Sequence, residues 1–287
     1  MKKVLSYIGI FVLSLFSFYY TDKASEIVKG KDPIMKNIMS NKDNYLIEPV
    51  NALISGDEIV SGINGKSVDV DNSYKKMKHY NIYDEDMYVF KEDNPILSFI
   101  NSYDKYVVGG NKIKNEIALV FKIVDSNYLD KLNHILLDKN IVGTLFVDGV
   151  VLEQYTDKIL ELISNGNQIE NLGYDLNYSK DKIGYTNNMI ESLTRKDARY
   201  CYTDYKNDDV LDICGKNNMY TIKPTISVSK YPFITVKNNI KSGDIVSFNM
   251  DSETIKELPS IISYLKQKGY KLVSLDNLIS ERYVDEK

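Results

Sequence analysis

Cysteine, histidine and tryptophan are scarce or missing in this sequence of 287 residues, which has two cysteines, two histidines and no tryptophan. Two cysteines do not make a disulfide framework in a chain of this size, so a Cys201–Cys214 disulfide and two free core thiols remain alternatives. Their spacing also lacks the pattern of a zinc site. The two histidines, His79 and His134, lie in expected helices, and neither lies at the end of an expected strand.

An excess of basic charge is also missing. The formal net charge is −4, whereas a nucleic-acid-binding protein usually carries a concentrated basic face. Hydrophobic residues make up 43% of the chain and charged residues 26%, which is typical of globular proteins. We therefore expect one large α/β domain with a smaller appendage, and no nucleic-acid partner.

The longest uncharged run lies near the N-terminus. It is "VLSYIGIFVLSLFSFYY", the 17 residues from Val4 to Tyr20, and two lysines precede it. A helix of this length is just sufficient to span a bilayer, and the lysines would keep the N-terminus in the cytoplasm. Residues 1–22 are predicted to be an uncleaved transmembrane signal anchor, with a cleaved signal peptide as the alternative. Both predictions place the rest of the chain outside the cytoplasm, and the anchor makes it a single-pass protein of the cell membrane.

Two segments with different patterns follow. Residues 23–44 are polar with weak helical periodicity, which predicts a stalk. Residues 45–112 show short apolar–polar alternations with turn signals at Gly56–Asp57 and Asn64–Gly65. These signals predict hairpins in a small, mostly β extension. One helix is expected in it, near "SYKKMKHY".

Residues 113–283 alternate between strand and helix patterns. The nearly continuous apolar run "EIALVFKIV" predicts a strand that is buried on both faces. The helix patterns include "NYLDKLNHILLDKN" and "SETIKELPSIISYLKQKG". This order predicts parallel strands joined by right-handed crossovers, which fits a distorted (β/α) barrel. In such barrels the functional residues lie at the carboxyl ends of the strands.

The order and spacing of these segments resemble the polysaccharide deacetylases, the NodB homology domain of carbohydrate esterase family 4. The resemblance covers roughly Glu116 to Ser280. "IALVFK" stands where the family has Thr-Phe-Asp-Asp, "IENLGYD" where it has a histidine motif, "ARYCYTDY" where it has Arg-Pro-Pro-Tyr-Gly, and "VSFNMD" where it has Leu-His-Asp. The resemblance implies hydrolysis of N- or O-acetyl groups on a sugar polymer, with a divalent metal, a carboxylate base and a histidine acid.

The residues at these positions lack the family's chemistry. Lys122 and Ile123 replace the two aspartates, Leu172 and Leu176 replace the two metal histidines, and Asn249 lies on or near the position of the acid histidine. An alkyl side chain has no lone pair for a metal, so we expect no bound zinc, no other cofactor and no catalytic residue. The expected degenerate pocket contains Lys122, Ile123, Glu170, Asn171, Leu172, Leu176, Arg199, Tyr202, Asn249 and Asp251.

Several charged residues near these strand ends allow alternatives. A hard cation could be held by carboxylate oxygens of Asp125, Glu170, Asp175 and Asp251. Lys122 could instead pair with Glu170 or Asp251, or attract a carboxylate of a wall polymer. Candidate residues for stacking on sugar rings are Tyr174, Tyr178, Tyr200 and Tyr202.

The leading functional prediction is a membrane-anchored, extracytoplasmic and catalytically inactive deacetylase-like protein. Its expected partner is cell-wall glycan, including peptidoglycan, or a surface protein. The alternative is a divergent active polysaccharide or peptidoglycan deacetylase whose ligands have moved. A third possibility is a structural or assembly role in which residues 45–112 make the contacts.

Overall fold

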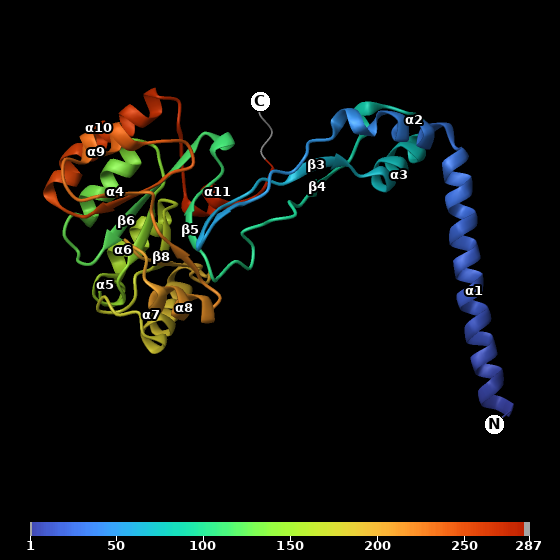
Figure 1. The fold of residues 1–287 in the computed structure, drawn as a ribbon, viewed down its shortest axis with the longest axis horizontal. Helices are drawn as coiled ribbons and strands as arrows, with labels where there is room; N and C mark the ends of the chain where they lie inside the picture. Colours follow the sequence, from blue (N-terminus) through green and yellow to red (C-terminus); the bar gives the residue numbers. More distant parts are fainter. Residues whose placement is uncertain (1, 284–287) are drawn as a thin grey trace. The chain divides into compact units, whose positions relative to one another are not determined.

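The chain forms two compact units (Figure 1). The computed structural model describes residues 2–283, without the side chains of residues 2–10, 15, 18, 22, 24 and 25. The first unit comprises residues 1–49 and 65–93, and the second comprises residues 50–64 and 94–287. The segment predicted as one extension, residues 45–112, is therefore divided between the two units.

The first unit consists of helices and a two-stranded antiparallel sheet. Its elements are α1 (Lys2–Lys31), α2 (Pro33–Asn41), the 3-10 helix η1 (Lys42–Tyr45), β3 (Gly65–Val68), α3 (Val70–Tyr80), the 3-10 helix η2 (Glu85–Met87) and β4 (Phe90–Asp93). Helix α2 begins because Asp32 Oδ1 accepts a hydrogen bond from the backbone N–H of Ile34 at 2.9 Å. Ile34 and Ile38 are buried in a small core with Met77 of α3. The predicted stalk therefore contributes a helix to this core, and the predicted helix in "SYKKMKHY" is confirmed by α3.

Helix α1 corrects the prediction of a membrane anchor. Within residues 2–283, as far as they are described, no helix is both long enough and apolar enough to cross a membrane. The uncharged run from Val4 to Tyr20 contains three serines and three tyrosines. Helix α1 continues beyond this run through charged residues to Lys31. The prediction that residues 1–22 form a transmembrane anchor is therefore wrong.

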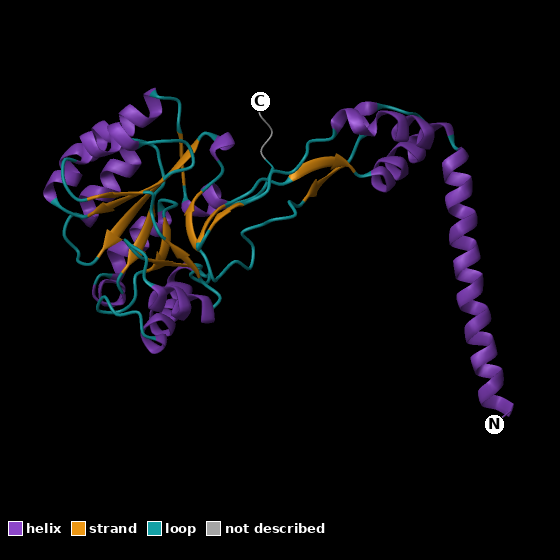
Figure 2. Ribbon diagram, in the orientation of Figure 1, coloured by secondary structure: helices purple, strands orange, loops and turns teal. Residues whose placement is uncertain are grey.

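The second unit is an α/β fold with two sheets (Figure 2). The larger sheet has the strand order β11-β12-β6-β7-β8 with β13 paired to β6, and all its pairs are parallel. The other sheet has the order β1-β2-β5-β10-β9, and its pairs are parallel except β1 with β2. The strands are β1 (Leu53–Ser55), β2 (Glu58–Val60), β5 (Tyr106–Gly109), β6 (Glu116–Ile123), β7 (Thr144–Val147), β8 (Gln168–Asn171), β9 (Tyr200–Tyr202), β10 (Tyr220–Ile222), β11 (Ile226–Val228), β12 (Ile245–Asn249) and β13 (Lys271–Val273).

Helices lie outside the sheets of this unit (Figures 1 and 2). They are the 3-10 helix η3 (Lys112–Lys114), α4 (Leu129–Asp138), α5 (Gly149–Gln154), α6 (Thr156–Ser164), α7 (Lys180–Thr194), α8 (Asp208–Lys216), α9 (Pro232–Asn239), α10 (Ser252–Gln267) and α11 (Leu275–Ile279). The helices predicted from "NYLDKLNHILLDKN" and "SETIKELPSIISYLKQKG" are confirmed by α4 and α10.

Strand β6 is buried on both faces, as its apolar run predicts. All of its residues are buried except Lys122, which is partly exposed. Leu119 and Phe121 face the helices, and the Phe121 ring packs on that of Phe248 in β12 with centroids 5.6 Å apart. Val120 belongs to a second core on the opposite face, which also contains the aromatic side chains of β9 and β10. This second core fills the space between the two sheets.

The two hairpin signals have different outcomes. Strands β1 and β2 form an antiparallel pair in which Ser55 lies opposite Glu58, and Gly56 has the left-handed φ of 61° that this tight turn requires. The Gly56–Asp57 hairpin is therefore confirmed. Strand β3, which begins at Gly65, pairs with β4 and not with β2. The predicted hairpin at Asn64–Gly65 is therefore wrong, because β3 finds its partner after α3.

Candidate functional site

A pocket of about 540 Å³ opens at the carboxyl ends of β6, β9 and β12. Its lining includes five of the ten predicted site residues: Lys122, Leu172, Leu176, Tyr202 and Asn249. The other lining residues are Val124, Tyr178, Thr203, Asp204, Tyr205, Asn207, Val210 and Met250. We call this the strand-end pocket. Its position is the one that the predicted barrel requires.

An ion pair inside this pocket joins β6 to the segment after β9. Lys122 Nζ lies 2.7 Å from Asp204 Oδ2, and the two side chains are 17% and 39% exposed. Asp204 Oδ1 also accepts a hydrogen bond from the hydroxyl of Tyr202 at 2.6 Å. The Lys122 ammonium lies 5.4 Å from the centre of the Tyr202 ring. Lys122 therefore pairs with Asp204, and the predicted pairing with Glu170 or Asp251 is wrong.

Tyr202 connects this ion pair to β12. Its hydroxyl lies 2.7 Å from Ser247 Oγ on β12 as well as close to Asp204. Burial raises the pKa of Tyr202, and its hydrogen bond to the Asp204 carboxylate raises it further. Tyr202 is therefore a neutral donor at physiological pH, and it holds Asp204 in place.

Asp148 holds the loop that replaces the family's histidine motif. It follows β7 and is buried. Its Oδ1 accepts hydrogen bonds from the backbone N–H groups of Val150 at 2.9 Å and Asp175 at 3.1 Å, and its Oδ2 accepts one from Leu176 at 2.7 Å. Asp175 and Leu176 both have left-handed φ values, 54° and 53°, which are uncommon for leucine. Asp148 therefore stabilises a strained loop, and both of its carboxylate oxygens accept hydrogen bonds in doing so.

Asp148 was missed by the sequence analysis. Its signal was the Asp-Gly pair directly after the apolar run "TLFV", where a polar side chain lies at a strand end. The two leucines of the loop differ in burial, because Leu172 is buried whereas Leu176 is exposed. Both nevertheless line the strand-end pocket.

Three predicted site residues have structural roles outside the pocket. Ile123 is buried in the core beneath the helices. Asn171 is buried, donates to the backbone carbonyl of Ile183 at 3.0 Å and accepts from the N–H of Gly173 at 2.6 Å. Asp251 caps α10 by accepting from the backbone N–H of Thr254 at 2.8 Å. The sequence placed these residues correctly near strand ends but could not show where their side chains point.

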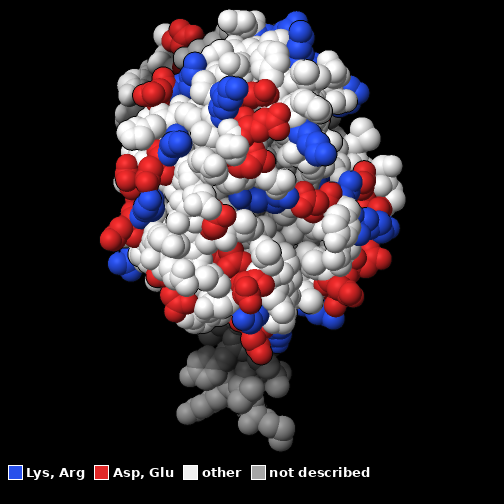
Figure 3. Space-filling view, turned by 90° about the vertical axis from the view of Figure 1, so that its left-hand side faces the viewer, with Lys and Arg blue, Asp and Glu red and all other residues white. Residues whose placement is uncertain are grey.

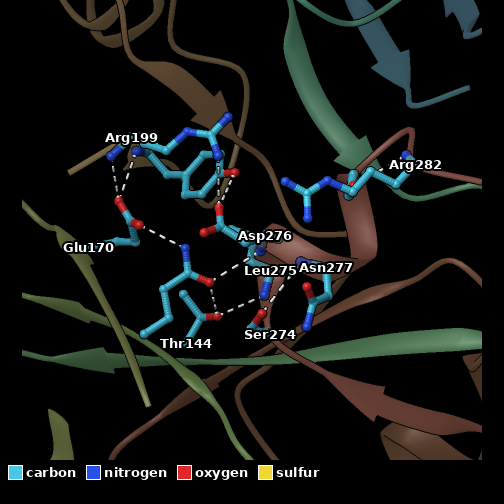
Figure 4. A network of polar contacts seen from close by, with 11 residues as sticks. Thr144, Glu170, Arg199, Ser274, Leu275, Asp276, Asn277 and Arg282 are labelled. Carbon is cyan, nitrogen blue, oxygen red and sulfur yellow. Dashed lines mark hydrogen bonds and ion pairs between the residues drawn. The ribbon is translucent and has the colours of Figure 1, made fainter. Parts of the chain in front are cut away.

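Glu170 and Arg199 lie in a different place, where β8 and β9 adjoin (Figure 4). Glu170 Oε2 accepts hydrogen bonds from the backbone N–H groups of Arg199 at 2.8 Å and Tyr200 at 2.9 Å. Its Oε1 accepts one from Gln168 Nε2 at 2.7 Å. Strands β8 and β9 belong to different sheets. The Glu170 side chain therefore supplies acceptors that a backbone ladder would otherwise provide.

Helix α11 completes this network. The Tyr200 hydroxyl donates to Asp276 Oδ1 at 2.6 Å, and Arg199 NH1 lies 3.3 Å from the same oxygen. The backbone N–H of Asp276 donates to Gln168 Oε1 at 3.1 Å. Burial raises the pKa of Glu170 to about 8, against the effect of the three donated hydrogen bonds, which lower it. Neither Glu170 nor Arg199 lines the strand-end pocket.

The carboxylates considered as a substitute cation site are not brought together. Asp125 accepts from the N–H of Asn127 at 2.7 Å, and Asp251 and Glu170 have the partners described above. In the described part of the chain, no three His, Cys, Asp or Glu side chains form a group that could hold a metal ion. Both histidines are exposed on helices, His79 on α3 and His134 on α4.

The tyrosines predicted to stack on sugars are mostly enclosed. Tyr200 and Tyr202 are buried, and Tyr178 is half-buried at the wall of the strand-end pocket. Tyr205 was missed, although it is 69% exposed and lines the same pocket. No pattern around Tyr205 distinguishes it from the other tyrosines of the chain.

The two cysteines form a disulfide between β9 and α8. Cys201 and Cys214 lie 13 positions apart, and their Cα atoms are 6.2 Å apart. Both are fully buried. The bridge ties the last turn of α8 to the strand that carries Tyr202, and it resolves the alternative that the sequence left open.

Charges of both signs are intermingled on the face of the second unit that Figure 3 presents. The view shows no large area that is only blue or only red.

No protein-family model matches the chain. The uncharacterized protein YlxY of Bacillus subtilis strain 168 is 24% identical to it over 276 residues, which is 89% of this chain and 86% of YlxY. The fold is similar to that of BA3943 from Bacillus anthracis, which is described as a carbohydrate esterase family 4 pseudoenzyme. Its structure has a TM-score of 0.67 and 25% identity, over 89% of this chain and 98% of BA3943.

Other solved structures match a shorter part of the chain. The family 4 carbohydrate esterase PdaA of Bacillus subtilis has a TM-score of 0.55 and 20% identity, over 63% of this chain and 87% of PdaA. The match to BA3943 therefore extends beyond the part that is shared with PdaA. The predicted resemblance to a degenerate polysaccharide deacetylase is confirmed, and the second unit has the α/β fold of these proteins.

Proposed function

We propose that this protein is a catalytically inactive, deacetylase-like protein that binds cell-wall glycan through the strand-end pocket. The observation that carries the proposal is the Lys122–Asp204 ion pair, which provides a cation of the chain itself on the strand where the family's reaction needs aspartates. A pocket that holds its own neutralising charge does not require a metal ion for its stability.

Inactivity follows from the chemistry of the residues that line the pocket. The reaction needs a divalent metal to polarise an acetyl carbonyl and a carboxylate to accept a proton. The ammonium of Lys122 has no lone pair, and the leucines at the two histidine positions cannot bind a metal. Asp148, which bonds to the backbone N–H of Leu176, already accepts three backbone hydrogen bonds.

Glycan binding is supported by the size and composition of the pocket. A volume of about 540 Å³ lies within the range of ligand sites. Tyr205 offers an exposed ring for stacking on the apolar face of a sugar, and Asn207 and Asn249 offer amides for hydroxyl and acetamido groups. One structure with a similar fold is that of the Bc1960 peptidoglycan N-acetylglucosamine deacetylase, with a TM-score of 0.56 and 20% identity over 62% of this chain. We therefore choose peptidoglycan as the probe.

The disulfide supports a location outside the cytoplasm. Disulfide bonds persist in oxidising compartments and are rare in the cytosol. The Cys201–Cys214 bridge is buried, so it has a structural role. Protein from cells, denatured in the presence of a thiol reagent and without prior reduction, tests this location. A disulfide leaves both cysteines unlabelled, whereas the reduced pair expected in the cytosol would be labelled.

Co-sedimentation of the full-length protein with insoluble peptidoglycan tests the function. We expect Tyr205→Ala to weaken binding about tenfold, the equivalent of about 1.4 kcal/mol, through loss of the stacking ring. Tyr80→Ala is the matched control, because Tyr80 is 63% exposed on α3 and does not line the pocket. The affinities of the two variants for peptidoglycan should therefore differ about tenfold. Equal binding by both variants would contradict the pocket, and no binding by the unmodified protein would favour a surface protein as the partner.

Metal analysis of the same preparation distinguishes the proposed inactive protein from the alternative, an active enzyme. We expect less than about a tenth of an equivalent of zinc, cobalt or manganese after dialysis, because the described residues offer no group of three ligands. A stoichiometric metal together with release of acetate from peptidoglycan would identify a divergent deacetylase with moved ligands.

A further inference from the structure

A second cleft, of about 870 Å³, lies beside the network at β8 and β9. It is formed by α7, the segment before β9, the turn after α8 and the start of α11. Arg199 and Asp276 line it, and they also line a smaller adjoining pocket of about 300 Å³. None of its lining residues belongs to the strand-end pocket. We call it the α7 cleft.

Arg199 is held in position within this cleft. Its backbone N–H donates to Glu170, and its guanidinium lies 3.3 Å from Asp276 Oδ1 and 5.5 Å from the centre of the Tyr200 ring (Figure 4). A guanidinium has five N–H donors. Among the described residues, Arg199 NH1 donates a hydrogen bond to Asp276. The side chain is still 51% exposed. Further donors are therefore available in a fixed geometry, at little cost in conformational entropy.

The charges of the cleft are nearly balanced, which argues against an anionic ligand. The charged lining residues are Glu191, Lys196, Asp197, Arg199 and Asp276. Two cations beside three carboxylates provide no net attraction for a phosphate or a polyanion.

The uncharged lining residues point to the chemistry of the ligand. They include four carboxamides and two phenols: Asn187, Asn188, Asn217, Asn218, Tyr103 and Tyr220. Carboxamides both donate and accept hydrogen bonds, so they can pair with hydroxyl and acetamido groups. Asn187 and Asn217 use part of this capacity within the protein, since Asn187 accepts from Asn171 and Asn217 donates to the carbonyl of Ile213. The rings of Tyr103 and Tyr220 lie 4.6 Å apart and form one apolar wall. This set suits a neutral saccharide better than a charged ligand.

Gly184 provides an independent observation. It lies inside α7, where glycine costs about 1 kcal/mol relative to alanine. Its backbone does not require glycine, and a Cβ placed on it would meet no atom within 4 Å. Neither packing nor backbone conformation explains this glycine. It lines the cleft, where a large side chain would occupy space that the glycine leaves to a ligand.

We infer that the α7 cleft is a second binding site, separate from the strand-end pocket, for a neutral saccharide segment that bears hydroxyl and acetamido groups. Arg199 is its central donor, the asparagine amides surround the ligand, and Gly184 leaves room for it. The inference concerns other residues than the proposed function does, so each can fail without the other.

Titration calorimetry of the full-length protein with tetra-N-acetylchitotetraose tests this site. We expect two binding sites in the unmodified protein and one in Gly184→Trp, because position 184 lines the cleft, a Cβ there meets no atom within 4 Å, and the indole beyond it would occupy space that the ligand needs. Gly184→Ala is the matched control. It should keep both sites and raise the free energy of unfolding by about 1 kcal/mol.

The outcomes separate the two proposals. Loss of a site in Gly184→Trp, with the affinities of both sites unchanged in Tyr205→Ala, supports the α7 cleft and contradicts the strand-end pocket. Weakened binding at one site in Tyr205→Ala, with both sites unchanged in Gly184→Trp, contradicts the α7 cleft and leaves the proposed function intact. Unchanged stoichiometry in Gly184→Trp, or no binding by the unmodified protein, overturns the inference. Arg199→Gln should reduce affinity at the same site that Gly184→Trp removes, and an unaltered affinity would also count against it.

Discussion

The Glu170 carboxyl group should make the stability of the protein depend on pH. It is buried between two sheets and accepts three hydrogen bonds, from Gln168 and from the backbones of Arg199 and Tyr200. Burial disfavours the charged form, whereas the three donors favour it. Burial prevails and raises the pKa from 4.5 to about 8. The folded protein therefore holds a proton at neutral pH that the unfolded chain has lost.

The sign and size of the effect follow from linkage. Between pH 4.5 and 8 the folded state binds more protons than the unfolded state, so the free energy of unfolding falls as the pH rises. With these two pKa values, the loss amounts to about 2 to 3 kcal/mol between pH 5 and pH 7. Most of the remaining loss, about 1 kcal/mol, follows by pH 9.

Glu170→Gln isolates this contribution, because glutamine does not titrate but can still accept from the N–H groups of Arg199 and Tyr200. Urea denaturation of both proteins at pH 5, 7 and 9 gives their difference in free energy of unfolding. We expect the unmodified protein to lose about 2 to 3 kcal/mol relative to the variant between pH 5 and pH 7. The control is Glu253→Gln, the same change at an exposed position, which leaves the Glu170 carboxyl group in place and should keep its fall in stability with pH.

Two results would refute this reasoning. A constant difference between the unmodified protein and Glu170→Gln would show that the Glu170 carboxyl group does not titrate in this range with a raised pKa. A gain in stability of the unmodified protein with rising pH would show that the three donated hydrogen bonds outweigh burial and keep the carboxylate ionised.

Two further predictions concern the stability that the disulfide contributes and the residues needed to bind zinc. Replacing Cys201 and Cys214 together by alanine should lower the free energy of unfolding by about 3 kcal/mol, since the bridge closes a loop of 13 positions. Thermal melting measures this, and addition of a reductant to the unmodified protein should reproduce the loss. The triple variant Lys122→Asp, Leu172→His and Leu176→His should bind zinc stoichiometrically, because all three positions line one pocket. Mass spectrometry after dialysis checks this, and a Leu172→His single variant without bound zinc is the control.

Local patterns in the sequence predicted the elements of the second unit well. The apolar run of β6 and the periodic helices α4 and α10 were correctly recognised, because burial on both faces and amphipathic periodicity are written into neighbouring residues. The strand-end pocket followed from the same alternation of strands and helices. Its position depends on the direction of parallel strands, which the alternation determines.

Partners that are distant in sequence could not be predicted. Asp204 pairs with Lys122 across 82 positions. Strands β2 and β5 pair in parallel although α3 and β4 lie between them in the chain, and this pairing divides the predicted extension between the two units. Such pairings depend on which strand edges meet after folding. No periodicity within either segment contains this information.

Strand β9 shows how a short strand misled the sequence analysis. The segment "ARYCYTDY" stands where the family has Arg-Pro-Pro-Tyr-Gly, and the strand within it covers the three residues Tyr200–Tyr202. Arg199 therefore precedes the strand and lies at its amino end, away from the strand-end pocket. An error of one or two residues in the boundary of so short a strand moves a side chain from one end of the barrel to the other. Boundaries are also the least certain part of any sequence-based prediction.

The Lys122–Asp204 pair balances charge within the strand-end pocket. Carboxylates gathered around an empty metal site repel one another, and an unpaired buried charge costs several kcal/mol. Here one cation and one carboxylate neutralise each other, and Tyr202 donates a further hydrogen bond to Asp204. The proposed function draws on this balance twice. An ammonium group at the position of a catalytic aspartate would prevent the family's reaction, and the same ammonium group would stabilise the pocket for binding.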